Sequence, residues 1–318
     1  MVMVAFGVPA PRRTATTTLR SGASLTNGLE DTRRAALAGQ VLDGIAYGSL
    51  LFVLAAGFTI ALGLMKVVNI AHGAFYMIGV YTALTIMDRT GNFLLATLGG
   101  AAAVMLIAAA LNEVFLKRLA NQPLRQVLFT FGVTLVIAES LRHIFGGYSQ
   151  LMATPDFLKG TLGSGTFTIP VYRAFVIAIA LALALGLWIM MTRTKIGAIV
   201  RACIDDQEIA GAVGINVQRV FTLMFGFSGA LAGFGGAVGA AFIGVYQGVQ
   251  FDILTLTLVV VVVGGLGSIP GALMGGMLIG VINSVGIAVV PQFAYFLLFG
   301  PMILILAFRP TGLLGRKE

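Results

Sequence analysis

The sequence predicts an all-α polytopic membrane protein with eight to ten transmembrane or partial membrane helices. Of its 318 residues, 58% are hydrophobic and only 10% are charged, whereas a soluble domain carries roughly 25% charged residues. The mean hydropathy is +0.99. The charges occur in short clusters separated by long uncharged stretches, and this pattern is typical of membrane spans.

Uncharged stretches of membrane length follow one another along the chain. A helix needs roughly 20 residues to cross about 30 Å of hydrocarbon. The stretches near this length are 44–65, 67–87, 90–112, 174–192, the longer 220–251, and a weaker candidate at 127–147 that contains Glu139, Arg142 and His143. Each of them predicts a membrane helix.

The stretch from Ile253 to Phe308 carries no charged residue and is too long for a single crossing. It is broken by the segment 267–270 and by Pro291. Because an odd number of crossings is needed, we expect three tight crossings with turns near Pro270 and Pro291. Partial helices are possible among them, since broken backbone is tolerated where it is packed inside protein.

Basic residues predict which ends of the spans face the cytoplasm. They cluster in the loop 113–125, in the segment 193–219 and at the C-terminus from Arg309 onward. Placing all three in the cytoplasm satisfies the positive-inside rule. The loop 148–172 then faces outside.

The side of the membrane on which the N-terminus lies stays undecided. Residues 1–40 are polar and predict a flexible tail, whereas residues 41–318 form one transmembrane domain. Two full spans before Met87 would place the tail outside, yet its five arginines favour the cytoplasm. A broken or re-entrant segment would reconcile the two. The tail lacks the apolar run and cleavage site of a cleaved signal peptide.

Several function classes lack support in the residues. The net charge of +8 is confined to the tail, the loops and the C-terminus, and does not form the basic face of a nucleic-acid binder. A single cysteine, Cys203, excludes an intrachain disulfide. The chain has no phosphate-binding P-loop, and His72 and His143 lack partners at metal-ligand spacing. We expect neither a metal site nor catalysis by this chain.

A polar stripe lies in the second predicted span. Asn69, His72, Tyr76 and Gly79 are spaced i, i+3, i+7 and i+10, so they share one face of a helix. Polar groups inside a span usually face the protein interior, because an unpaired amide or imidazole in lipid is costly. The stripe predicts either a hydrogen-bonded clamp between helices or the lining of a translocation path.

The cytoplasmic segment 193–219 has a helical pattern between two spans. Its charged residues at helical spacing are Arg201, Asp205 and Glu208, its apolar ones are Ile199, Cys203, Ala210 and Val213, and Gly214 is the expected end. A helix too polar to span the membrane and too apolar to float freely indicates docking against a soluble partner. A solvated loop helix is the alternative.

Glycine is dense between residues 226 and 286. It forms small-xxx-small pairs, which let membrane helices approach closely: Gly229/Gly233, Gly235/Gly239, Gly271/Gly275 and Gly276/Gly280. Internal helix packing is the main expectation, and a dimer seam or a thin pore lining is the alternative.

The polar stripe from Asn69 to Gly79 and the cytoplasmic segment 193–219 resemble the LivH-type permeases of branched-chain amino-acid ABC importers, and the resemblance runs from about Val41 to Gly315. The resemblance also rests on the segment 264–272 and on the terminal segment 308–315. It implies the ABC importer permease fold and a multi-pass protein of the bacterial inner membrane. It implies that Glu208, Ala210 and Gly214 are similar to the coupling signature of such permeases, with Ile209 departing from it.

The partners are also implied by the resemblance. They are a LivM-type permease or a second copy of the chain, two cytoplasmic ATPases that bind the ATP and Mg²⁺, and an external solute-binding protein. Substrates of the family include branched-chain amino acids, amides, urea and aromatic acids. Arg201, Asp205, Glu208, Ala210 and Gly214 would couple the chain to the ATPases, and Asn69, His72 and Tyr76 would line the path.

An ion- or proton-coupled secondary transporter or a channel is the rival interpretation. Such proteins usually place ionisable groups at mid-membrane. The acidic residues here lie at span ends, and Glu139 alone falls within a predicted span.

Overall fold

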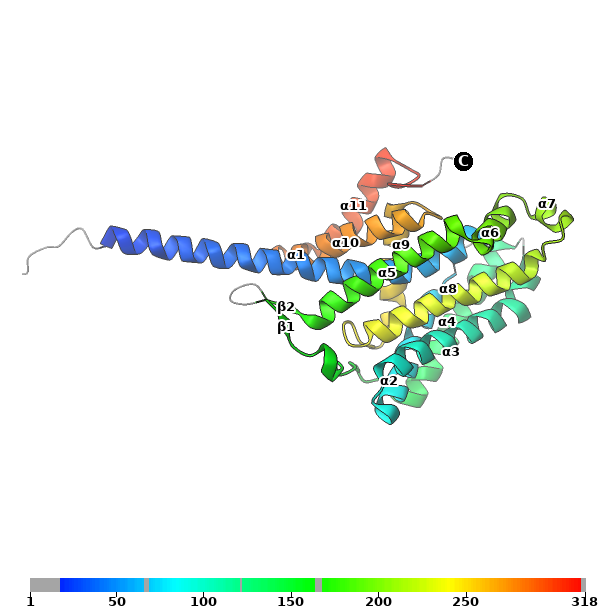
Figure 1. Cartoon of the computed structure of the whole chain (residues 1–318), viewed down its shortest axis with the longest axis horizontal. Helices are drawn as coiled ribbons and strands as arrows, with labels where there is room; N and C mark the ends of the chain where they lie inside the picture. The colour runs from blue at the N-terminus through cyan, green and yellow to red at the C-terminus, as the bar shows by residue number, and fades with distance from the viewer. Residues whose placement is uncertain (1–17, 66–68, 121, 164–167, 316–318) are drawn as a thin grey trace, which may run out of the picture.

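The computed structural model describes residues 18–65, 69–120, 122–163 and 168–315. It is a bundle of helices with one short hairpin (Figure 1). The longer helices are α1 (Thr18–Met65), α2 (His72–Thr90), α3 (Phe93–Val114), α4 (Pro123–Phe145), α5 (Val171–Arg193), α8 (Val217–Gly239), α9 (Val249–Gly264), α10 (Ile269–Val289) and α11 (Ala294–Phe308). The shorter elements are η1 (Leu116–Leu119), η2 (Asp156–Leu158), β1 (Thr161–Leu162), β2 (Ile169–Pro170), α6 (Lys195–Asp205), α7 (Gln207–Ala212) and η3 (Pro291–Phe293).

Nine of these helices form the membrane bundle in the described part of the chain. Six are long and apolar enough to cross a membrane, namely Leu37–Gly63 of α1 with α3, α4, α5, α8 and α10. α9 and most of α11 are shorter apolar helices, and α2 packs among the others. The prediction of eight to ten membrane segments is confirmed. The stretch from Ile253 to Phe308 contains α9, α10 and α11, with turns beside Pro270 and Pro291.

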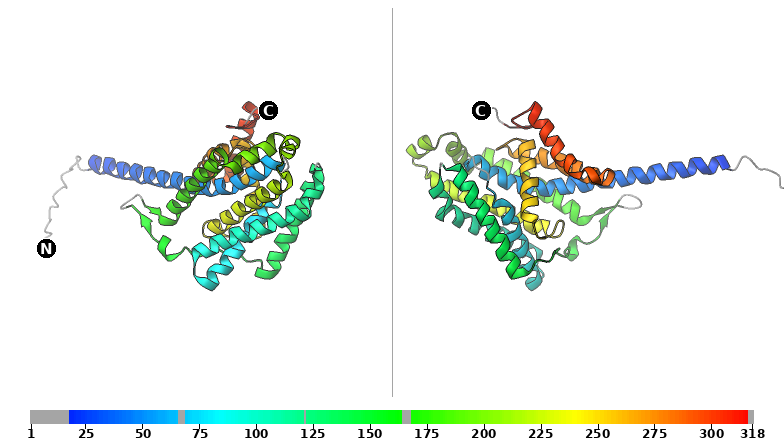
Figure 2. Two further views of the ribbon diagram at one scale, coloured as in Figure 1. Left: turned by 45° about the vertical axis from the view of Figure 1, so that its right-hand side comes forward. Right: turned by 180° about the vertical axis from the view of Figure 1, so that it is seen from behind.

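α1 is the longest element, with 48 residues and a length of about 72 Å at 1.5 Å per residue. Its N-terminal part projects well beyond the bundle (Figures 1 and 2). The helix therefore begins inside the stretch that the sequence predicted to be a flexible tail, of which residues 1–17 lie outside the described residues. Extending a helix from a formed span costs less than nucleating one, and residues 29–38 are rich in the helix formers Ala, Leu, Arg and Glu.

The loops divide between two ends of the bundle, which we call the basic end and the hairpin end. η1, α6, α7 and the C-terminal segment lie at the basic end, and the β1–β2 hairpin lies at the opposite end (Figure 1). At the basic end Asn112 Nδ2 donates to Thr222 Oγ1 at 2.9 Å, and the Leu313 N–H donates to the Val263 carbonyl at 2.9 Å. At the hairpin end Arg173 forms an ion pair with Asp43 of α1. α1 therefore enters from the hairpin end, and the part of α1 that precedes its span at Leu37 projects beyond it.

The charges differ between the two ends. The basic residues at the basic end are Lys117, Arg118, Arg125, Arg193, Lys195, Arg201, Arg219 and Arg309. At the hairpin end, three basic side chains are paired with carboxylates, in the pairs Arg142–Glu139, Lys159–Asp156 and Arg173–Asp43. Arg89 also lies at that end, and Arg20, Arg33 and Arg34 lie on the part of α1 that projects from it. By the positive-inside rule, the loops between the spans favour the basic end as the cytoplasmic one, whereas the arginines of the projecting part of α1 do not.

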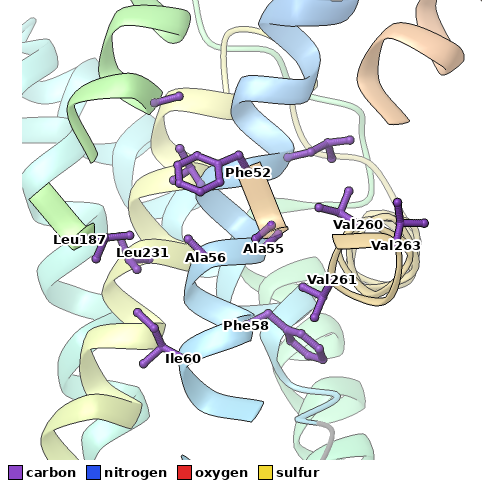
Figure 3. Close-up of a cluster of buried hydrophobic side chains, with 14 of the residues drawn as sticks. Phe52, Ala55, Ala56, Phe58, Ile60, Leu187, Leu231, Val260, Val261 and Val263 are labelled. Atoms are coloured by element: carbon purple, nitrogen blue, oxygen red, sulfur yellow. The ribbon is translucent and has the colours of Figure 1, made fainter. Parts of the chain in front are cut away.

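The core is built around the apolar part of α1. In that part, 83% of the residues of its most apolar window are buried, against 11% for α4 and 17% for α5. Figure 3 shows Ala56 of α1 beside Leu231 of α8 and Phe58 of α1 beside Val261 of α9, with α9 viewed nearly along its axis while α1 lies across the view. α9 thus crosses α1 at a steep angle, which a short helix buried in protein can do.

Glycines allow the close approach of these helices. A Cβ on Gly79 would lie 2.3 Å from the Gly233 carbonyl oxygen, and a Cβ on Gly276 would lie 2.8 Å from that of Gly48. The four predicted glycine pairs all face neighbouring helices or turns of this chain: residues of α3 for Gly229 and Gly233, Leu54 for Gly235, Tyr76 for Gly239, α9 for Gly271 and Gly275, and α1 for Gly276 and Gly280. These contacts confirm the main expectation, that the glycine pairs serve helix packing within the chain.

Candidate functional site

α2 begins deep inside the bundle, at His72. The His72 side chain is fully buried, and its Nε2 lies 3.0 Å from the carbonyl oxygen of Leu54. Leu54 lies midway between Asp43 and Met65 along α1, so His72 sits near the middle of that span. Its ring also meets the Phe58 ring edge-on, with centroids 5.3 Å apart. α2 therefore starts at mid-depth rather than at the surface of the bundle.

Asn69 and Tyr76 flank His72 and are buried as well. Asn69 Oδ1 accepts the N–H of Ala71 at 3.1 Å and shapes the turn before the helix. The Tyr76 hydroxyl donates to the Gly244 carbonyl at 2.9 Å, which ties α2 to the loop between α8 and α9. His72 and Tyr76 thus form hydrogen bonds that hold α2 to other segments of the bundle, as the clamp interpretation predicts. Contact of the three side chains with a solute stays a prediction.

Several buried polar atoms of the bundle have no hydrogen-bond partner in the described structure. They come from α1, α2, α4, α8, α9 and the turn before α2: Thr59 Oγ1, Asn69 Nδ2, His72 Nδ1, Gln126 Oε1, Ser228 Oγ, Gln250 Oε1 and Thr257 Oγ1. A buried polar atom left unpaired costs about 1–3 kcal/mol. Groups of this kind are expected to be satisfied by water or by a bound solute, and polar groups inside a membrane bundle mark solute pathways.

A pocket opens at the hairpin end, outside this buried interior. Its volume is about 150 Å³. It is lined by residues of α2, α4, the loop after α4, and the segment that leads into α9: Met77, Tyr81, Leu135, Ala138, Glu139, Arg142, Gly146, Gly147, Tyr148, Tyr246, Gln247, Gly248 and Gln250. In the sequence, Glu139 and Arg142 counted as charges that weaken a span, and Glu139 also as support for an ion-coupled transporter. Their i, i+3 spacing on one helix was the signal that could have marked a polar site.

The segment 193–219 contains two helices, α6 and α7, rather than the single one that its helical pattern predicts. Asp206 has an extended backbone (φ −153°, ψ 112°), which ends α6 at Asp205. Its Oδ1 then accepts the N–H groups of Glu208 and Ile209 at 2.8 and 2.9 Å, so Asp206 is the N-cap of α7. Arg201 and Asp205 therefore lie on a different helix from Glu208, and the three do not share one helical face.

Gly214 ends α7 as predicted, with φ +90°. The Ile215 N–H donates to the Ala210 carbonyl at 3.1 Å across this turn. Ala210 and Cys203 are buried against the bundle, whereas Arg201, Asp205, Glu208 and Gly214 are exposed. Of the predicted coupling residues, four are therefore exposed and one, Ala210, is buried against the bundle. Their coupling role stays a prediction.

The exposed face of α6 and α7 also carries apolar side chains. Ile196, Ile209 and Val213 are 54%, 64% and 72% exposed. The start of α6 is fixed to the end of α5, because Thr194 Oγ1 accepts the Gly197 N–H at 3.2 Å and donates to the Met190 carbonyl at 2.6 Å. Exposed isoleucines on a segment too charged to enter lipid are typical of a protein docking surface. Sequence reasoning missed Ile196 and assigned Ile209 no such role.

Among the described residues, no group of three or more His, Cys, Asp or Glu side chains could hold a metal ion. The buried polar side chains there are Ser, Thr, Asn, Gln and His, without a carboxylate. Glu139, the residue that favoured an ion-coupled transporter, is exposed and paired with Arg142.

Residues 40–306 match the family described as the branched-chain amino acid transport system permease component. The chain is 31% identical over 301 residues to the high-affinity branched-chain amino acid transport system permease protein BraD of Pseudomonas aeruginosa, which covers 88% of this chain and 96% of that relative. It is 29% identical over 300 residues to the permease protein LivH of Escherichia coli, with the same coverage. It is 26% identical over 285 residues to LivM of Salmonella typhimurium, which covers 82% of this chain and 67% of that relative. No solved structure matches the chain.

Proposed function

Because this chain belongs to the permease family of branched-chain amino acid transport systems and is a membrane permease subunit of an ABC importer, we propose that it forms half of the pathway for branched-chain or related amino acids. The family match over 267 residues, from 40 to 306, carries the proposal. The relatives' names give their substrates as branched-chain amino acids. Amides, urea and aromatic acids are the other solutes to be tested.

We further propose the assembly and its place in the cell. The other half of the pathway is a LivM-type permease, and the chain's similarity to both LivH and LivM supports such a pair. Two ATPases bind ATP at the basic end, and a solute-binding protein docks at the hairpin end. The complex lies in the bacterial inner membrane with the basic end in the cytoplasm, which places the basic residues of the loops 113–125 and 193–219 on that side.

Energy reaches the bundle through α6 and α7. Closure of the ATPases moves this pair of helices, which the Thr194 cap holds to α5 and the Asn216 cap holds to α8. Arg201, Asp205, Glu208 and Gly214 form the exposed docking face, and Ala210 anchors it. Movement of α5 and α8 then shifts the bundle between outward-open and inward-open states. Asn69, His72 and Tyr76 line the path in those states.

Uptake in cells tests the proposal. A bacterial strain without branched-chain amino-acid uptake should accumulate labelled leucine when the permease pair, the ATPases and the binding protein are all supplied. Omission of this chain alone should abolish accumulation, because half of the pathway is then missing. Unchanged leucine uptake without the chain would contradict the proposal.

A further inference from the structure

We propose that the pocket at the hairpin end is the entry subsite for the transported solute, and that it selects a zwitterionic amino acid through Glu139, Arg142 and Gln250. This inference rests on the proposed function, and it names a site within it. It follows from three independent features of the pocket: its charge pair, its unpaired buried amide and its apolar wall.

The charge pair places both signs in the lining of the pocket. Arg142 Nε donates to Glu139 Oε2 at 3.0 Å, and a second guanidinium nitrogen contacts Oε1. The two side chains are 52% and 65% exposed, so further donors of Arg142 and lone pairs of Glu139 are open to a ligand. An α-carboxylate can accept hydrogen bonds from the remaining Nη donors of Arg142, and an α-ammonium can donate to the carboxylate of Glu139. Urea and simple amides carry neither charge and gain nothing comparable.

Gln250 forms part of the pocket lining and is 7% exposed. Its Oε1 is one of the buried atoms without a partner in the described structure. The Gln250 carbonyl lies against Gly73, where a Cβ would approach to 1.8 Å. Gln250 therefore stands between the pocket and the start of α2, next to His72. An acceptor left unpaired at this point is placed to receive an N–H donor from an entering solute.

Another part of the pocket lining is an apolar wall. Met77 and Tyr81 are each 4% exposed, and the Tyr81 ring stacks on Phe145 at 4.4 Å, which holds this wall in place. Leu135 and Ala138 of α4 complete it. A cavity needs about 10–15 Å³ to hold one water molecule, so about 150 Å³ has room for roughly the non-hydrogen atoms of a leucine-sized molecule. The pocket thus offers an aliphatic side chain an apolar surface and its backbone two charges.

The direct test is leucine binding to the permease–ATPase complex in lipid nanodiscs without the binding protein, so that the specificity of that protein does not enter. We expect Arg142→Gln and Gln250→Leu each to weaken the binding of labelled leucine by about tenfold or more, the usual effect of losing a charge-assisted or buried hydrogen bond. Leucinamide and the oxo acid of leucine, which each lack one charge, should compete poorly, and urea should not compete.

Lys159→Gln is the matched control. Lys159 pairs with Asp156 at i, i+3 spacing at the same end, is exposed and does not line the pocket. The Lys159→Gln variant should bind leucine with the affinity of the parent protein. Equal affinity in Arg142→Gln and the parent, no binding by the parent, or competition by urea would each overturn the subsite.

A second measurement does not depend on the stability of these variants. In a Cys203→Ala background, leucine added from outside should protect Ala138→Cys from a membrane-impermeant thiol reagent and should not protect Lys159→Cys. Equal labelling of Ala138→Cys with and without leucine would contradict the subsite. If the parent importer takes up leucine while these tests fail, only the subsite is wrong. If the parent takes up no amino acid, the proposed function itself is wrong.

Discussion

The imidazole Nε2 of His72 lies 3.0 Å from the carbonyl oxygen of Leu54, so the first residue of α2 is fastened to the middle of α1. A carbonyl only accepts hydrogen bonds, so Nε2 carries the proton. In the neutral ring, Nδ1 is then an acceptor, and it lacks a partner in the described structure. His72 therefore combines a clamp between two helices with a buried acceptor that has no partner in the described structure.

Replacing His72 separates these two roles. His72→Leu should lower the free energy of unfolding by about 1 kcal/mol, the net value of one buried hydrogen bond, and should abolish most leucine uptake. The control is Thr134→Val, which removes a buried hydroxyl bonded only to Thr130 of its own helix at 2.8 Å. Thermal unfolding of the purified complex and uptake at matched expression measure the two effects. Uptake by His72→Leu that falls only in proportion to folded protein would leave the clamp as its sole role.

Close helix packing depends on Gly79. A Cβ there would meet the backbone of Gly233 at 2.3 Å, and backbone cannot move aside. Gly79→Ala should therefore separate α2 from α8 and lower the thermal stability of the complex by several degrees. Gly132→Ala on α4 is the control, because no atom lies within 4 Å of its Cβ. Its stability should be unchanged or raised by up to about 1 kcal/mol, as for glycine to alanine within a helix.

Coupling through α7 is tested by two glycines that differ in backbone conformation. Neither Gly211 nor Gly214 has an atom within 4 Å of an added Cβ, but only Gly214 has a positive φ, of +90°. Gly214→Ala should distort the end of α7, at a backbone cost of roughly 1–2 kcal/mol, and should reduce ATPase activity stimulated by the binding protein. Gly211→Ala should retain most of it.

Glu208→Lys tests the exposed docking face without altering the backbone. Because Glu208 is exposed, its reversal should leave membrane insertion and stability nearly unchanged. It should abolish stimulated ATPase activity and uptake, since it places a positive charge on the docking face. Normal uptake by Glu208→Lys at matched expression would remove this residue from the ATPase interface.

The orientation of the chain can be tested with introduced cysteines. Cys203 itself is a poor reporter, because it is fully buried and burial raises the pKa of its thiol, which lowers the reactive thiolate fraction at neutral pH. In a Cys203→Ala background, an impermeant maleimide should label Thr161→Cys and Leu37→Cys from outside the cell. Gln207→Cys should be labelled only in inside-out vesicles. Labelling of Leu37→Cys only from the cytoplasm would contradict the entry of α1 at the hairpin end.

Much of the fold could be predicted from charge and hydropathy alone. The spans α3, α5 and α8 coincide with uncharged stretches, because lipid excludes charge and a fixed thickness sets their length. The division of the stretch after Ile253 into three helices followed from the same argument together with the positions of Pro270 and Pro291, although only α10 among them is long enough to be a full span. The helical extension of α1 did not follow, since polar composition alone does not separate a solvated helix from a flexible tail.

The site was less predictable, because its geometry depends on contacts between distant segments. The face shared by His72 and Tyr76 follows from helical spacing, but Leu54 and Gly244 as their partners do not. The break at Asp206 was missed because a capping aspartate in the middle of a charged segment resembles any other exposed carboxylate. Gln250 carried no signal, because its importance comes from burial beside Gly73.

The most direct test of the account is the energy source for transport in proteoliposomes. We predict that the chain, a LivM-type permease, two ATPases and the binding protein together accumulate labelled leucine only when ATP is supplied on the side of the basic end. Omission of any one component should abolish accumulation. Leucine uptake by this chain alone, driven by a proton or sodium gradient without ATP, would contradict the account.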